Sequence, residues 1–171
     1  MRNIGQEQLS AKAEELGEKL SAQGWFMATA ESCTGGWIAQ TVTAISGSSQ
    51  WFDRGFVTYS NQAKIEMLGV ELATIGEYGA VSGETAAEMV RGALAAARVE
   101  IAVAVTGVAG PDGGTPQKPV GTVWFGWATK NTEPVTKKMC FAGDRESIRA
   151  QTVSVAIDGL LELTAALTIA K

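Results

Sequence analysis

The residues with the clearest capacity for chemistry lie in the segment TAESCTGG, residues 29–36. An apolar run precedes this segment and an amphipathic helical pattern follows it, so we predict a strand, a sharp polar turn and a helix. Such a turn exposes Ser32 at the edge of a sheet as a candidate nucleophile and directs backbone N–H groups at whatever binds there. The alternative is a purely structural Ser/Thr helix cap, followed by glycines that allow close packing.

The same turn carries candidate oxyanion donors and a second candidate nucleophile. The N–H groups of Thr34, Gly35 and Gly36 open the predicted helix without helical partners. We expect them to stabilise a developing oxyanion, an effect of roughly 3–4 kcal/mol per donor in other enzymes. Cys33 lies beside Ser32, but neighbouring side chains point in different directions, so only one of the two can serve. We favour a buried structural role for the cysteine, because free cysteines are commonly buried.

The chain contains no histidine, and this absence restricts the catalytic chemistry strongly. It excludes a Ser-His-Asp triad, a Cys-His pair and the usual zinc sites. A base that works near neutral pH must then be a lysine or carboxylate with a shifted pKa, or a tyrosine coupled to one. Lys64 is the candidate base, and Tyr59 is placed to relay a proton to it or to polarise Ser32. Alternatively, Lys64 is a solvated helix lysine and Tyr59 a core aromatic residue.

A glycine-rich loop, residues 106–114, is the third polar segment that follows a predicted strand. Its glycines allow backbone N–H groups to approach a phosphate or carboxylate closely, and a mobile surface loop is the alternative. The loop lacks the spacing of dinucleotide-binding and Walker motifs. A phosphate also requires a cation, and Lys118, Arg145 and Arg54 are the nearest candidates. The predicted substrate-binding residues are Thr106, Gly107, Gly110, Gly113 and Arg145.

Helical and strand patterns alternate along the chain and predict an α/β fold with a mostly parallel sheet covered on both faces. A final hairpin makes the sheet mixed. Ligands bind beyond the carboxyl ends of the strands in such folds, so the three polar segments should line one crevice. The expected helices cover residues 6–22, 35–45, 61–68, 71–76, 83–98 and a long segment after 144; the expected strands cover 25–30, 52–59, 101–105, 120–128 and 135–141.

The composition excludes several classes of partner. The 171 residues, 46% of them hydrophobic, suit one domain over residues 1–171. The net charge of −4 and the lack of a basic run argue against a nucleic-acid partner. No uninterrupted apolar stretch reaches the ~18 residues of a membrane span, so no membrane partner is expected. Two unpatterned cysteines suit a reducing cytosol, and we expect a cytoplasmic protein.

Several short motifs, in a fixed order, resemble the CinA C-terminal domain family over residues 6–165. The similarity is closest to stand-alone bacterial members that are nicotinamide-nucleotide amidases. The family's catalytic serine, tyrosine and lysine fall on Ser32, Tyr59 and Lys64. The motifs are TAESCTGG at 29–36, GSS at 47–49, RGFVTY at 54–59 with Lys64, GAVS at 79–82, TGVAGPDGG at 106–114 and KPVGTV at 118–123.

The resemblance implies a three-layer α/β/α sandwich with a five-stranded mixed sheet, and no metal or cofactor. It implies hydrolysis of nicotinamide mononucleotide to nicotinate mononucleotide and ammonia in pyridine-nucleotide recycling, by a homodimer. The aromatic residues Trp124, Phe125 and Trp127 also favour a dimer. Two alternatives stay open: a non-catalytic nucleotide- or partner-binding module associated with competence and DNA uptake, and an amidase for another pyridine carboxamide.

Overall fold

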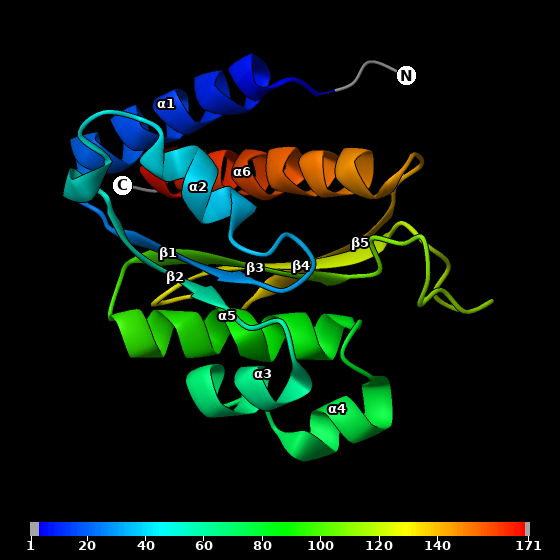
Figure 1. The fold of residues 1–171 in the computed structure, drawn as a ribbon. Coiled ribbons are helices and arrows are strands. Elements are labelled where there is room, and N and C mark those ends of the chain that lie inside the picture. The colour runs from blue at the N-terminus through cyan, green and yellow to red at the C-terminus, as the bar shows by residue number, and fades with distance from the viewer. Residues whose placement is uncertain (1–3, 170–171) are drawn as a thin grey trace.

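The computed structural model describes residues 4–169, which fold around one five-stranded sheet (Figure 1). The sheet order is β2-β1-β3-β4-β5. Strand β1 pairs in parallel with β2 and β3, whereas β4 is antiparallel to β3 and to β5. Only β4 therefore runs against the others, and the predicted mixed, mostly parallel sheet is confirmed. The strands are β1 (Met27–Glu31), β2 (Phe52–Val57), β3 (Ile101–Gly107), β4 (Thr122–Thr129) and β5 (Val135–Cys140).

Helices cover both faces of the sheet and complete the predicted three-layer sandwich (Figure 1). One layer contains α1 (Gln6–Gln23), α2 (Trp37–Thr43) and α6 (Arg145–Ile169). The other contains α3 (Asn61–Leu68), α4 (Leu72–Tyr78) and α5 (Gly83–Ala97), with α5 lying directly on the sheet. A short 3-10 turn, Ser48–Gln50, joins α2 to β2.

The two faces of β3 explain how the layers pack. Ile101, Val103 and Val105 fill the core toward α1 and α6, whereas Ala102 and Ala104 face α5. Small residues let the α5 layer come close to its neighbours: a Cβ on Gly126 of β4 would lie 2.6 Å from the carbonyl oxygen of Ala86 in α5. The alternation of branched residues and alanines along β3 thus places large side chains between the sheet and the α1–α6 layer, and small ones between the sheet and α5.

Helix α6 is long and apolar enough, over Arg145–Leu167, to cross a membrane by length and composition alone. The sequence pattern did not indicate this, because polar residues interrupt the helix. In the structure, α6 packs between α1 and the sheet and buries Ile148, Val153, Ile157 and Leu160 in the core. Core packing therefore accounts for its apolar composition.

Two element boundaries differ from the predicted ones in a way that shapes the site. Strand β2 ends at Val57, so Tyr59 lies in the link to α3 and not in the strand. Ser60 ends this link and caps α3, its hydroxyl accepting from the N–H of Ala63 at 3.0 Å. Helix α2 begins only at Trp37, because the residues before it form the turn after β1.

Candidate active site

The carboxyl ends of β1, β2 and β3 meet at a cavity of about 200 Å³. The turn after β1, the start of α3, the segment before α5 and the end of β3 each supply part of its wall. Most of the side chains predicted from the sequence to act together are thus brought together. The lining residues are Ser32, Cys33, Tyr59, Asn61, Lys64, Ala80, Val81, Thr106, Gly107, Ala109 and Arg145.

Lys64 contacts Ser32 directly within this cavity. Its Nζ donates to the Ser32 Oγ at 3.0 Å, to the carbonyl oxygen of Thr58 at 2.9 Å and to that of Tyr59 at 3.4 Å. The Lys64 side chain is 1% exposed, so it is not the solvated helix lysine of the alternative interpretation. Burial lowers the pKa of this amine from its usual 10.5, because the charged form loses hydration. The shift favours the neutral amine, which can accept the hydroxyl proton.

Cys33 is buried, as the sequence predicted, and its thiol is poorly suited to act as the nucleophile. Burial raises the pKa of the Cys33 thiol to about 12, with a smaller contribution from the Glu31 carboxylate. The reactive thiolate is therefore scarce near neutral pH. Of the two candidate nucleophiles in this turn, Ser32 is therefore the better suited, because its hydroxyl contacts the Lys64 amine.

Glu31, which the sequence interpretation did not single out, organises the turn. Its side chain is fully buried, and its carboxylate accepts five hydrogen bonds. Three come from backbone N–H groups at the start of α2, those of the preceding Gly36 and of Ile38 and Ala39, so the carboxylate caps that helix. A carboxylate at the end of an otherwise apolar strand was the signal in the sequence. The donors are the hydroxyls of Thr29 (3.2 Å) and Thr34 (2.7 Å) and the N–H groups of Gly36 (3.1 Å), Ile38 (2.9 Å) and Ala39 (2.8 Å).

These contacts correct the predicted set of oxyanion donors. The N–H of Gly35 donates to the carbonyl oxygen of Ser32 at 3.1 Å, and that of Gly36 is held by Glu31. The prediction that these two glycines present free N–H groups is therefore wrong. Within residues 4–169, the N–H groups of Cys33 and Thr34 have no hydrogen-bond acceptor in another residue. Only these two groups of the turn stay available to a bound oxyanion.

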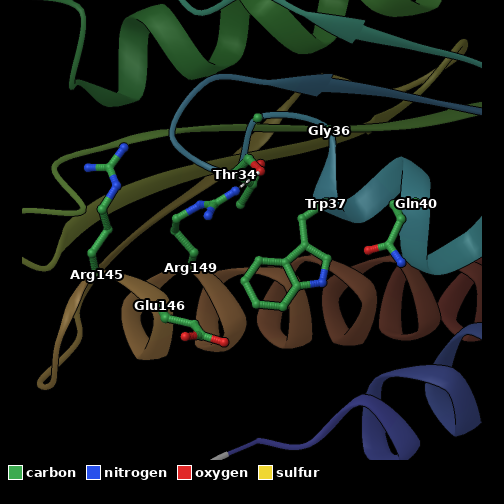
Figure 2. A pocket seen from close by; sticks show the side chains of 8 residues that line it. Thr34, Gly36, Trp37, Gln40, Arg145, Glu146 and Arg149 are labelled. Carbon is green, nitrogen blue, oxygen red and sulfur yellow. Dashed lines mark hydrogen bonds between the residues drawn. The ribbon is translucent and has the colours of Figure 1, made fainter.

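Arg149 of α6 holds the other side of the turn (Figure 2). Its Nε donates to the carbonyl oxygen of Cys33 at 3.1 Å and its Nη2 to that of Thr34 at 2.8 Å, while its guanidinium lies 5.2 Å from the centre of the Trp37 ring. In a planar trans peptide the C=O and N–H point in opposite directions. Arg149 therefore directs the Thr34 N–H away from α6. No local pattern in the sequence predicts this contact, because Arg149 lies 116 positions after Cys33.

Tyr59 lies at the mouth of the cavity and does not bridge the serine and the lysine. Its side chain is 62% exposed, and its hydroxyl accepts from the Nη2 of Arg145 at 3.1 Å. It is therefore not the core aromatic residue of the alternative interpretation, and no hydrogen bond within residues 4–169 joins its hydroxyl to Ser32 or Lys64, as a proton relay or a polarising contact would require. Arg145 also donates from Nη1 to the carbonyl oxygen of Gly110 at 2.6 Å. The tyrosine and the glycine-rich loop are thus tied together by the first residue of α6.

The glycine-rich loop reaches the cavity only through its first residues. Thr106 and Gly107 line it, with the Thr106 hydroxyl donating to the carbonyl oxygen of Ala80 at 2.7 Å. Gly110 contributes only the carbonyl that Arg145 binds, and the exposed Gly113 does not line the cavity. The predicted anion nest over the whole loop is not formed around this cavity.

Of the three candidate cations, Arg145 alone lies at the cavity. Lys118 donates to the carbonyl oxygen of Tyr78 at 2.7 Å, at the end of α4. Arg54 is exposed on β2 and pairs with its neighbour Asp53. Within residues 4–169, no three Cys, Asp or Glu side chains are grouped so that they could hold a metal ion. The site thus offers a hydroxyl, an amine and backbone donors.

Comparisons with known proteins agree with this fold. Residues 9–164 match the CinA C-terminal domain. The chain is 52% identical over 153 residues to the nicotinamide-nucleotide amidohydrolase PncC of Escherichia coli K12, covering 90% of this chain and 93% of that protein. It is 52% identical over 155 residues to the protein of the same name from Pseudomonas putida, covering 91% and 96%.

A solved structure shows the same architecture. The crystal structure of the competence/damage inducible protein CihA from Agrobacterium tumefaciens superposes with a TM-score of 0.90 at 43% identity. The match covers 95% of this chain and 98% of that one. Since both sequence and structure match over almost the whole length, the chain belongs to the CinA C-terminal domain family.

Proposed function

We propose that this protein hydrolyses the carboxamide of nicotinamide mononucleotide to nicotinate mononucleotide and ammonia, as a step of pyridine-nucleotide recycling. The names of the two relatives at 52% identity support the substrate. The observation that carries the mechanism is the 3.0 Å contact between the Lys64 Nζ and the Ser32 Oγ. A serine paired with a buried amine is a nucleophile with its base, which an amidase without histidine requires.

The mechanism begins when the neutral Lys64 amine takes the proton of Ser32 as the Oγ attacks the carboxamide carbon. The N–H groups of Cys33 and Thr34 bind the oxygen that becomes negative in the tetrahedral intermediate. Lys64 then returns the proton to the nitrogen, the C–N bond breaks and ammonia leaves an ester on Ser32. A water molecule, deprotonated by the same amine, attacks this ester and releases the carboxylate product.

The remaining cavity residues bind and orient the substrate in this proposal. Thr106 and Gly107 contact the pyridine ring, while Tyr59 contacts the ribose at the mouth and Arg145 supplies positive charge there.

We also propose that the protein works in the cytoplasm as a homodimer. Light scattering coupled to size-exclusion chromatography measures the mass in solution directly, and a mass near the 17.9 kDa of one chain would refute the dimer.

The decisive test is ammonia release by Ser32→Ala and, as a matched control, Cys33→Ala. We expect the first variant to lose at least ~10³-fold in kcat, as when a nucleophile is removed, and the second to stay within a few-fold of the wild type. Retained turnover in Ser32→Ala would reject the serine mechanism. If calorimetry shows that the mononucleotide binds but no ammonia is released, the protein is a binding module. If free nicotinamide is turned over faster than the mononucleotide, the amidase has a different substrate.

A further inference from the structure

A larger, more open pocket adjoins the catalytic cavity on the α6 side (Figure 2). It measures about 580 Å³ and lies between the start of α2 and the start of α6. Residues of the Ser32 turn line both spaces, with Ser32 and Cys33 at the catalytic cavity and residues 34–36 at this pocket, and Arg145 also lines both. The pocket is lined by residues 34–36, Trp37, Gln40, Arg145, Glu146 and Arg149.

The charges in this pocket favour an anion. Arg145 and Arg149 stand four residues apart on α6, and neither forms an ion pair with a carboxylate among residues 4–169. Glu146 is the one carboxylate in the lining. Like charges at this spacing, near the positive end of a helix, destabilise the helix. Two arginines against one carboxylate leave the lining with net positive charge in a chain of net charge −4, and this charge favours a negative partner.

The two guanidinium groups retain free hydrogen-bond donors. Each has five N–H groups, and the structure uses two on Arg149 for carbonyls and two on Arg145 for Tyr59 and Gly110. Gly35 has no side chain to cover the guanidinium of Arg149, whereas a Cβ at this position would lie 3.7 Å from the Arg149 Nη2. Contacts with carbonyls, and for Arg145 also with the Tyr59 hydroxyl, thus hold both planar groups in place. Each keeps N–H donors for bidentate binding of a phosphate.

The size of the catalytic cavity shows why a substrate would reach this pocket. At about 200 Å³ it lies below the roughly 300–1,000 Å³ of pockets that enclose small-molecule ligands. It suits a pyridine carboxamide, so the ribose and phosphate of a mononucleotide must extend beyond it. We propose that Arg145 and Arg149 bind the phosphate monoester of the substrate in the pocket between α2 and α6. This subsite rests on the proposed function.

The test compares two substrates that differ only in the phosphate, nicotinamide mononucleotide and nicotinamide riboside. Arg149→Gln and Arg145→Gln should each lower the ratio of kcat/KM for the mononucleotide to that for the riboside by at least ~10-fold. Any effect of Arg149 on the Ser32 turn is common to both substrates and cancels in the ratio. The matched control is Arg91→Gln, an exposed arginine on α5 paired with Glu133, which should leave the ratio unchanged. Equal losses on both substrates would overturn the proposal.

A binding measurement separates this proposal from the enzymatic one. Ribose 5-phosphate is titrated calorimetrically into Ser32→Ala and into Ser32→Ala combined with Arg149→Gln. We expect one site on the parent variant and at least ~10-fold weaker binding with the second change. No binding to the parent would overturn the subsite. If the wild type releases no ammonia, the proposed function fails, but this titration still shows whether the pocket binds phosphate. If the enzyme does not turn over the riboside, the kinetic ratio cannot be measured, and the titration is then the test of the phosphate site.

Discussion

Replacing Glu31 by glutamine tests how the nucleophile turn is held. The Oε1 of Glu31 accepts from the Thr29 hydroxyl at 3.2 Å and the Ala39 N–H at 2.8 Å. The Oε2 accepts from the Thr34 hydroxyl at 2.7 Å and from the N–H groups of Gly36 and Ile38 at 3.1 and 2.9 Å. An amide NH₂ cannot accept, so in either orientation it faces at least one backbone N–H that then has no partner.

The cost of Glu31→Gln can be estimated from these contacts. An unpaired buried donor costs about 1–3 kcal/mol, and each remaining bond weakens by roughly 1 kcal/mol when the acceptor loses its charge. The lower desolvation cost of the neutral amide offsets part of this loss. We therefore expect the free energy of unfolding to fall by about 2–4 kcal/mol, a large share of the 5–15 kcal/mol typical of a domain.

Urea denaturation followed by circular dichroism measures this change, and ammonia release measures its effect on the site. At a urea concentration where the variant is still folded, kcat should fall by about 10- to 100-fold, because the Thr34 N–H is no longer fixed by its neighbours. Glu66→Gln makes the same change on the exposed face of α3 and should alter neither quantity. A Glu31→Gln protein with wild-type stability and turnover would refute this account of the turn.

Three further changes give distinct outcomes. Because burial lowers the pKa of Lys64 below 10.5, the unfolded chain binds more protons between the two pKa values. In urea titrations, the free energy of unfolding of the wild type should rise relative to that of Lys64→Met as the pH increases toward about 10.5. A difference between the two proteins that does not change with pH would contradict the lowered pKa of Lys64. Gly92→Ala should lower the midpoint of thermal unfolding and cost about 1–3 kcal/mol, because its Cβ would lie 1.9 Å from the Leu68 carbonyl oxygen; Gly76→Ala, which meets nothing within 4 Å, is the control. Tyr59→Phe should lower kcat for ammonia release by only a few-fold, since its hydroxyl does not contact the reacting pair; a loss near that of a missing nucleophile would restore the relay.

Local sequence patterns predicted the architecture well. The alternation of helical and strand periods, the apolar run of β3 and the strand-turn-helix around Ser32 depend on neighbours in the chain, and they specify an α/β sheet with polar loops at one edge. The absence of histidine restricted the candidate base to a lysine or a carboxylate with a shifted pKa, or a tyrosine coupled to one, and Lys64 was the lysine singled out. Motifs in a fixed order indicated the CinA C-terminal domain family, to which the chain belongs.

Only the tertiary structure decided how the site is assembled. It brings Lys64 into direct contact with Ser32, turns Tyr59 outward to Arg145, and leaves Gly113 outside the cavity. It also adds Arg149, 116 residues from the carbonyl it binds. Periodicity along a chain indicates which face of an element is buried, but a hydrogen bond between distant segments depends on how two rigid elements pack. Such contacts are visible only once the layers are in place.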